Sequence, residues 1–262
     1  MLIDWHTHLS DYKNIHNAID IINQNNIVTI ACSMDIESYK KTLICAKNNN
    51  LIIPTFGIHP AKSNLVTQLD SLDELLETSK IIGEIGLDNF WVKDIPQKIQ
   101  ENVFEYILHH CNHERKFCVI HTKGAEKRVL EILQNFPDCK PIIHWYNGPK
   151  DIFDQCIKRR YYLTFGLELH YSQYIKELLK QTPLELILSE TDNPESENWL
   201  GGNSDSPLLI TRVVQDIARV MNKTPEEIEN EIWLNSLKIL QESGINAEKY
   251  KTEGLQCTSK SL

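Results

Sequence analysis

The stretch IVTIA, residues 27–31, is apolar at nearly every position. A strand with one solvated face alternates polar and apolar side chains, whereas a parallel strand covered on both faces reads as a nearly continuous apolar run. Helical patterns precede and follow it, at residues 15–25 and 38–49. The stretch therefore predicts a buried parallel strand between two helices.

The same alternation of short apolar runs and longer helical patterns continues along the chain. Eight runs are predicted strands: Leu2–Trp5, Ile27–Cys32, Leu51–Phe56, Ile81–Glu84, Phe117–His121, Pro141–His144, Tyr161–Phe165 and Leu186–Ser189. The helical patterns between them are Ile15–Asn25, Ser38–Asn49, Leu69–Thr78, Pro96–His113, Gly124–Asn135, Pro149–Lys158 and Ser172–Lys180. This order in a chain of 262 residues predicts an α/β protein with a (β/α)₈ TIM barrel.

A doubly wound open sheet is the alternative fold. No GxGxxG or GxxxxGK[ST] phosphate loop follows any predicted strand, which weakens the nucleotide-binding version of that fold. We predict one barrel domain over residues 1–244, with a capped helix starting at Thr224-Pro225-Glu226-Glu227 near its end. Residues 245–262 are polar and are predicted to form a partly disordered tail.

Composition is that of an ordinary globular protein, with 41% hydrophobic and 24% charged residues. There is no apolar run of about 18–20 residues and no signal-peptide pattern at the N-terminus, so we expect a cytoplasmic protein without membrane contact. The seven cysteines include no CxxC, which argues against a disulfide framework or a thiolate zinc site. A net charge of −9 counts against non-specific wrapping of duplex DNA, but not against a nuclease that holds phosphate through metal ions.

Histidines and carboxylates recur where the predicted strands end. His6 and His8 close the first strand as His-x-His, and the strand period of two places both imidazoles on one side. The other members of this set follow later strands: His59, Glu84, His121, His144 and Asp192. In a barrel these ends meet on one face, where active sites lie. Six of these seven side chains, all except His59, could together hold two divalent cations bridged by a carboxylate.

These residues sit in motifs that carry a family resemblance. The motifs are DWHTHL at 4–9, GIHP at 57–60, GEIGLD at 83–88, IHTKGA at 120–125, HWYNG at 144–148 and SETDNP at 189–194. In content and order they resemble the TatD family of metal-dependent deoxyribonucleases, which belongs to the amidohydrolase-like barrels. The resemblance extends from residue 2 to about residue 240 and ends with Asn235 in the last helix. The HW-aromatic-x-G form also resembles the TatD-like branch of Qat antiphage operons.

The resemblance implies a two-metal hydrolase and assigns a role to each residue. One ion would be held by His6, His8 and Asp192, Glu84 would bridge, and His121 and His144 would complete the second ion's ligands. His59 would contact the substrate phosphate. Zn²⁺, Mg²⁺ and Mn²⁺ all suit such a ligand set.

This chain departs from the family pattern at three places. Lys123 stands where the family usually has an arginine, and it can neutralise phosphate only as a point charge. The usual HCFSG motif reads His144-Trp145-Tyr146-Asn147-Gly148, and the loop at 195–206 lacks an arginine. These departures leave the metal ligands intact and bear on substrate preference.

Other residues near the motifs receive weaker assignments. Glu190, Asp88 and Asp4 are expected behind the ligands rather than among them. The indole of Trp91 could stack on a nucleobase, as could the rings of Trp145 and Tyr146, or these rings could simply pack the loops. The cluster His109, His110 and His113 is interpreted as a solvated helix end, because histidines there complement the helix dipole.

The resulting hypothesis is a deoxyribonuclease, exonuclease-like, that acts on single-stranded DNA or DNA ends. A metal-activated water would attack the phosphodiester, Asp192 would accept its proton beside the bridging Glu84, and His59 and Lys123 would hold phosphate oxygens. One alternative is an amide or ester hydrolase, such as a small-molecule amidohydrolase or an aminoacyl-ester deacylase, since the same ligands serve attack at a carbonyl. A second is an assembly subunit without catalysis, which the complete ligand set opposes.

Overall fold

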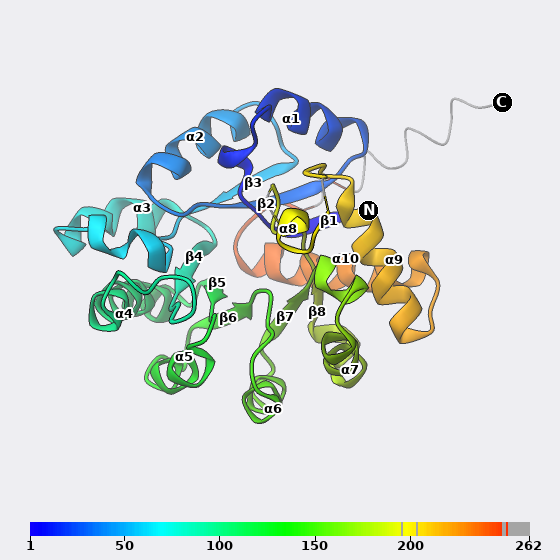
Figure 1. Cartoon of the computed structure of the whole chain (residues 1–262). Helices are drawn as coiled ribbons and strands as arrows, with labels where there is room; N and C mark the ends of the chain where they lie inside the picture. The colour runs from blue at the N-terminus through cyan, green and yellow to red at the C-terminus, as the bar shows by residue number, and fades with distance from the viewer. Residues whose placement is uncertain (195, 203, 248–249, 251–262) are drawn as a thin grey trace.

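Eight parallel strands form the centre of the computed structural model, which describes residues 1–194, 196–202, 204–247 and 250. The strands are β1 (Ile3–Thr7), β2 (Val28–Cys32), β3 (Ile52–Thr55), β4 (Ile82–Gly86), β5 (Phe117–His121), β6 (Lys140–Ile143), β7 (Tyr162–Phe165) and β8 (Ile187–Ser189). Helices lie around them on the outside (Figure 1). The predicted (β/α)₈ barrel is confirmed.

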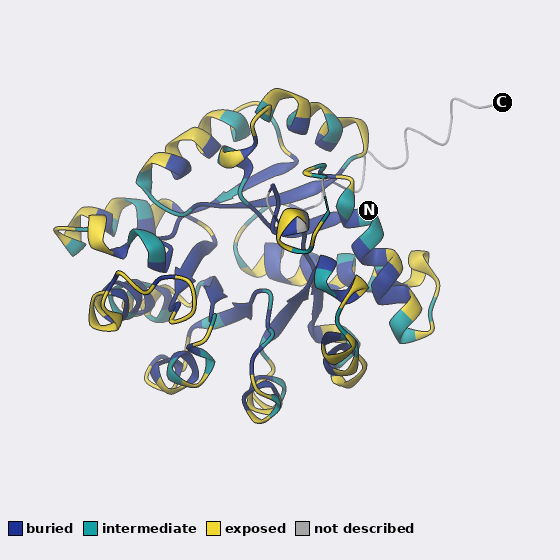
Figure 2. Cartoon of the chain, in the orientation of Figure 1, coloured by how far each residue is buried: buried dark blue, intermediate teal, exposed yellow. Residues whose placement is uncertain are grey.

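The outer helices follow the strands in sequence. They are α1 (Ile15–Gln24), α2 (Ile36–Ala46), α3 (Asp73–Thr78), α4 (Gln97–Glu114), α5 (Glu126–Leu133), α6 (Lys150–Lys158), α7 (Gln173–Gln181) and α9 (Leu209–Met221). Each turns its apolar stripe inward and its polar face to solvent, as the dark inner and yellow outer surfaces of Figure 2 show. The predicted helix at Leu69–Thr78 is a 3₁₀ turn, Leu69–Leu72, that continues into α3.

Hydrogen bonding divides the barrel wall into two sheets, β1-β2-β3 and β4-β5-β6-β7-β8. Single bridges close both seams: Phe56 pairs with Ile82, and Thr7 pairs with Asn193. The seams matter because predicted site residues flank them. Asp192 donates its amide to the carbonyl of His6 at 2.8 Å, and Glu84 donates its amide to the carbonyl of Ser33 at 3.0 Å.

Two further helices close the ends of the barrel. The short helix α8 (Ser196–Trp199) lies in front of the strands in Figure 1, and α10 (Pro225–Glu242) lies behind them. The predicted cap of α10 is present as a capping box between Thr224 and Glu227. The indole of Trp5 in β1 is fully buried and donates a hydrogen bond to Ser236 Oγ of α10 at 2.7 Å. This contact anchors α10 under the first strand.

The end of the chain is described only in part. Most of the predicted tail, residues 245–262, lies outside the described residues. Of its described members, Tyr250 is buried and donates its hydroxyl to the carbonyl of Asn50 at 2.8 Å. Among the described residues, no helix is long and apolar enough to cross a membrane.

Candidate active site

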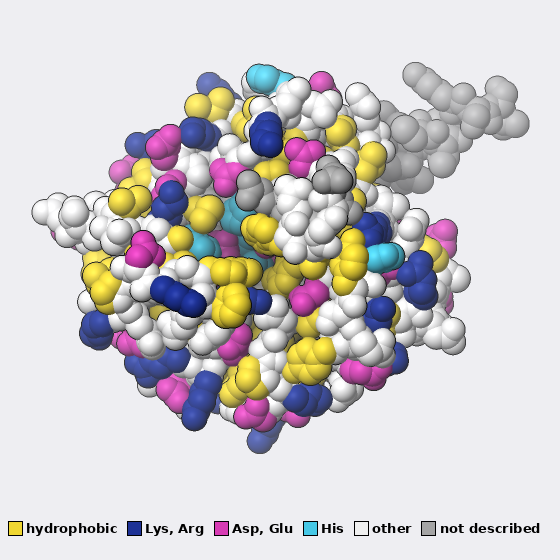
Figure 3. Space-filling model, in the orientation of Figure 1, with side chains coloured by type: hydrophobic (Ala, Val, Ile, Leu, Met, Phe, Trp, Pro, Cys, Tyr) yellow, Lys and Arg dark blue, Asp and Glu magenta, His cyan; other side chains and the backbone are white. Residues whose placement is uncertain are grey.

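A cleft of about 960 Å³ opens at the carboxyl ends of the strands. Predicted site residues that line it include His8, His59, Glu84, His121, Lys123, His144 and Asp192, while His6 lies buried against them. Figure 3 shows this hollow with histidine and acidic side chains inside and hydrophobic side chains beside it. The structure thus brings together every residue that the sequence assigned to metal binding, proton transfer or phosphate contact.

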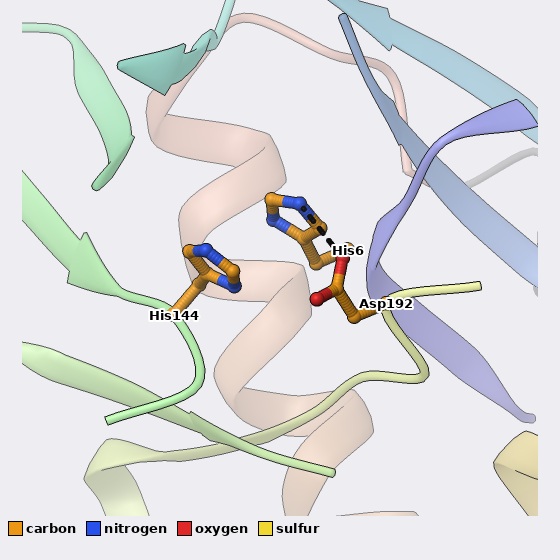
Figure 4. A group of neighbouring side chains, drawn as sticks. All are labelled: His6, His144 and Asp192. Atoms are coloured by element: carbon orange, nitrogen blue, oxygen red, sulfur yellow. Dashed lines mark ion pairs between the residues drawn. The ribbon is translucent and has the colours of Figure 1, made fainter. Parts of the chain in front are cut away.

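The first group of candidate ligand atoms surrounds one point. Nε2 of His6 lies 3.3 Å from Nε2 of His8, and each of these atoms lies 3.4 Å from Oε2 of Glu84. Oδ1 of Asp192 lies 3.5 Å from His6 Nε2 and 3.3 Å from His8 Nε2. Figure 4 shows the Asp192 carboxylate directed toward the rings of His6 and His144.

The second group is built around the other oxygen of Glu84. Oε1 lies 2.8 Å from Nδ1 of His121 and 2.8 Å from Nε2 of His144, and these two nitrogens are 3.2 Å apart. Nε2 of His59 lies farther away, 3.7 Å from the same oxygen. The two oxygens of Glu84 therefore face different sets of histidines.

The first group suits a divalent cation. Ligand atoms about 2.1 Å from a tetrahedral ion lie about 3.4 Å from one another, which matches the spacings of the first group. Glu84 Oε2 and Asp192 Oδ1 are buried and have no hydrogen-bond partner within the described part of the chain. Buried carboxylate oxygens are rarely left without a partner, so their place among histidine nitrogens fits a cation.

The electrostatics of the cleft favour positive charge at its floor. Burial would raise the pKa of Glu84, but the surrounding histidines outweigh it and hold that pKa well below its usual value. Burial likewise opposes ionisation of Asp192, and the neighbouring imidazoles of His8, His6 and His144 outweigh it and lower the pKa. Despite burial, Glu84 and neighbouring carboxylates raise the pKa of His144 well above its usual range.

Three buried carboxylates, those of Asp88, Glu190 and Asp4, lie behind the candidate ligands, as expected from the sequence. Asp88 Oδ2 lies 2.9 Å from Nε2 of His121. Glu190 Oε2 lies 3.5 Å from Nδ1 of His144. Asp4 accepts hydrogen bonds from the Thr191 hydroxyl at 2.6 Å and the Thr191 amide at 2.9 Å, and burial raises its pKa to about 7. Asp88 and Glu190 thus contact candidate ligand imidazoles directly, whereas Asp4 binds Thr191, the residue before Asp192.

His59 is arranged as a hydrogen-bond donor to the cleft. Its Nδ1 accepts the amide of Ala61 at 3.1 Å, and burial lowers its pKa to about 3. The neutral ring therefore carries its proton on Nε2, the nitrogen that faces Glu84. The glycine of the GIHP motif lets the segment that carries His59 pass close to Glu84. A Cβ on Gly57 would lie 2.3 Å from the carbonyl oxygen of Glu84.

Lys123 brings a cation to the rim of the cleft. Its Nζ lies 4.9 Å from the ring centroid of Trp91 and 5.5 Å from that of Phe90. Trp91 and Trp145 also line the cleft, but Tyr146 is buried elsewhere and donates its hydroxyl to the carbonyl of Pro149. The interpretation of Tyr146 as a ring available for stacking is therefore wrong.

Trp199 lines the cleft as well, and the sequence analysis missed it. It belongs to α8, in the loop after β8, where no repeating pattern assigns a direction to a side chain. Its ring centroid lies 5.9 Å from that of Trp91 and 6.4 Å from that of Trp145. Only the folded structure shows that these three indoles meet.

The histidine cluster in α4 has no part in the cleft. His110 pairs with Asp73 at 3.2 Å, His113 pairs with Glu114 at 2.9 Å, and the ring of His109 packs against Phe136.

Asn235, the last residue of the family resemblance, makes hydrogen bonds within the fold. Its amide donates to the carbonyls of Leu184 and Ile187 at 2.8 and 2.9 Å, which ties α10 to β8.

Fold and site together define a (β/α)₈ barrel with a cleft of histidines and carboxylates at the carboxyl ends of its strands. The family model described as "TatD related DNase" matches residues 3–241, and the chain belongs to this family. It is 24% identical over 247 residues to the uncharacterized metal-dependent hydrolase MJ1582 of Methanocaldococcus jannaschii, covering 91% of this chain and 96% of the relative. It is 23% identical over 261 residues to human deoxyribonuclease TATDN3, covering 91% and 94%. The crystal structure of YJJV, a TatD homolog from Escherichia coli K12, superposes with a TM-score of 0.82 at 20% identity, covering 91% of this chain and 97% of that one.

Proposed function

We propose that this protein is a divalent-metal-dependent hydrolase, and specifically an exonuclease-like deoxyribonuclease. The observation that carries the proposal is the placement of Glu84, whose two oxygens face two separate sets of histidines 2.8–3.4 Å away. A carboxylate in this position is suited to bridge two cations, and a pair of cations is a common means of phosphodiester cleavage. Membership of the TatD family supports this substrate class.

The proposed ligand sets follow the two groups of atoms. His6, His8 and Asp192 would hold one ion, His121 and His144 the other, and Glu84 both. When bound, such ions lower the pKa of a water molecule and stabilise charge on the attacking and leaving oxygens. Zn²⁺, Mn²⁺ and Mg²⁺ remain candidates, because imidazole favours the first and carboxylate chemistry with phosphate suits the others.

The side chains of this chain supply proton transfer and substrate positioning. Asp192 is ionised and lies at the edge of the first group, so it is placed to accept the proton of the attacking water. His59 would donate Nε2–H to a phosphate oxygen, because its Nδ1 is already occupied by Ala61. Lys123 would neutralise a second phosphate charge at the rim.

Digestion of single-stranded DNA labelled at either end tests this function. We expect stepwise shortening with Mg²⁺, Mn²⁺ or Zn²⁺, none with a chelator, and none with Asp192→Asn. Asp151→Asn is the matched control, because Asp151 is exposed on α6, outside the cleft, and should leave cleavage intact. Protein shown by metal analysis to hold its ions but unable to cut DNA would contradict the proposal. An RNA strand and an aminoacyl ester in the same assay would then show whether another phosphodiester or a carbonyl is attacked.

A further inference from the structure

Three indoles from separate loops meet at the mouth of the cleft. Trp91 comes from the loop after β4, Trp145 follows β6, and Trp199 ends α8. Trp199 lies between the other two, with ring centroids 5.9 Å and 6.4 Å away. All three line the cleft that contains Glu84 and the histidines. We call these three residues the indole cluster.

The exposure of this cluster calls for an explanation. Trp91 is 57% exposed and Trp199 is 54% exposed, and Phe90 beside them is 55% exposed. Large aromatic surface left in water is unfavourable, and contiguous exposed apolar patches commonly mark binding sites. Trp91 and Trp199 line the same cleft as the candidate metal ligands, so the ligand that covers them would be the substrate itself.

The position of Lys123 indicates the chemistry of that ligand. Its ammonium group lies 4.9 Å from the ring of Trp91 and within the same cleft. A ligand that fits would join a flat aromatic group to an anion, as a nucleotide does. Asn147 and Glu168 also line this part of the cleft and offer polar groups to the edge of a base.

Two of the indole residues are connected to the candidate metal centre by a carboxylate. In each case one carboxylate binds the backbone amide of the tryptophan and also contacts a histidine of the centre. Asp88 Oδ1 accepts the amides of Phe90 and Trp91 at 2.8 and 2.7 Å, while its Oδ2 holds His121 at 2.9 Å. Glu190 Oε1 accepts the amide of Trp145 at 2.8 Å, while its Oε2 faces His144. A group bound between the rings would therefore have a defined position relative to the reacting phosphate.

We propose that the indole cluster is a nucleobase-binding subsite that takes an unpaired base at the end of a DNA strand. This proposal rests on the proposed nuclease function. Bases in a duplex are stacked on one another and hide their faces, so a site made of ring faces selects single-stranded or frayed ends. Stacking is tolerant of base identity, which suits a nuclease without a sequence motif to read.

The test compares strands with and without bases on the metal-loaded enzyme. Trp91→Ala and Trp199→Ala are expected to raise KM for oligo-dT by about 5- to 100-fold each, the range that follows from loss of one stacked base. Replacing either tryptophan by Phe instead of Ala should leave KM close to the wild-type value. An oligonucleotide with abasic terminal residues should be bound weakly by the wild-type enzyme, and the Ala variants should not weaken it further. Tyr171→Ala is the matched control, because Tyr171 is 48% exposed but does not line the cleft.

Binding of a fluorescent oligo-dT with phosphorothioate linkages gives a readout that does not require cleavage. Binding that weakens with each Ala variant supports the subsite, even if the enzyme cleaves no DNA and the nuclease function is wrong. Equal losses for normal and abasic strands, or no loss at all, would overturn the subsite. In that case cleavage by the wild-type enzyme would leave the nuclease function standing.

Discussion

Asp88 fixes the orientation of His121: its Oδ2 lies 2.9 Å from Nε2 of the imidazole, and Nδ1 of the same ring then points to Glu84 at 2.8 Å. Despite burial, the hydrogen bond with His121 and two backbone amides lowers the pKa of Asp88 to about 2, so the carboxylate is ionised and can only accept. In the neutral form that metal binding requires, His121 therefore donates from Nε2 and presents the lone pair of Nδ1 to the candidate metal centre. Asp88, which is not itself a candidate ligand, thus sets the tautomer of the candidate ligand His121.

Replacing Asp88 by Asn should weaken metal binding. The amide cannot accept with the same strength, and loss of such a partner typically costs about 10- to 100-fold in metal affinity. Competition with a chromophoric chelator measures the change. Asp94→Asn, an exposed carboxylate in the same cleft, should stay within about twofold of the wild-type affinity. Equal affinities for the Asp88 variant and the wild type would contradict this role.

If the proposed two-ion site is correct, Glu84→Gln should reduce the bound metal from two ions per chain to fewer than one. The substitution removes the negative charge between the two sets of histidines, and each ion would lose a carboxylate ligand. Metal analysis after gel filtration gives the count. Glu168→Gln changes a carboxyl group in the same cleft and should keep both ions. A Glu84 variant that retains two ions would show that the carboxylate does not bridge.

Lys123→Met should raise KM for DNA by about 10- to 100-fold, because a hydrogen-bonded charge on phosphate is lost while the aliphatic length is kept. Lys123→Arg keeps the charge and should remain close to the wild type. The Met variant should also show a weaker dependence of KM on salt, since one phosphate contact is missing. If KM rises equally in the Arg and Met variants, the charge of Lys123 does not act on the substrate.

Gly57→Ala should reduce the metal content of the protein, although Gly57 is not itself a candidate metal ligand. A Cβ there would lie 2.3 Å from the carbonyl oxygen and 2.6 Å from the amide nitrogen of Glu84, so β4 would have to shift. We expect lower metal occupancy and a lower melting temperature. Gly166→Ala is the comparison, because its Cβ would meet only ordinary contacts of 3.4 Å. Full metal occupancy in the Gly57 variant would be inconsistent with this close approach.

The ion pair between α4 and α5 should make stability depend on pH. Arg128 Nε and Nη2 donate to the two oxygens of Glu101 at 2.7 and 3.1 Å, and these hydrogen bonds lower the pKa of Glu101. A carboxylate with a lowered folded-state pKa stabilises the protein above its unfolded-state pKa and loses this contribution as the pH falls. Glu101→Gln should therefore cost about 0.5–1 kcal/mol at neutral pH.

Urea unfolding of the chelator-treated protein measures this difference. The free energies of unfolding of the wild type and the Glu101 variant should converge as the pH is lowered toward about 3, below the usual pKa of a glutamate. Chelation removes metal binding from the comparison, since ligand protonation would otherwise change stability at the same pH. A difference that stays constant over this range would show that the ion pair contributes nothing.

The sequence by itself determined the barrel and the set of residues at its catalytic end. The apolar run at 27–31 and its seven counterparts are local patterns, and the rule that parallel strands end on one face then brings His6, Glu84 and Asp192 together. Side-chain direction along a strand follows the period of two, so His6 and His8 could be placed on one side without a structure.

Tertiary structure alone decided which atoms face one another and which loop residues reach the cleft. The division of Glu84 between two sets of histidines depends on the seam between β3 and β4, which no local pattern marks. Tyr146 turns away from the cleft. Trp199 is distant from Trp91 in the sequence, but its ring lies close to that of Trp91. Loops lack a repeating hydrogen-bond pattern, so packing between segments far apart in the chain sets the direction of their side chains.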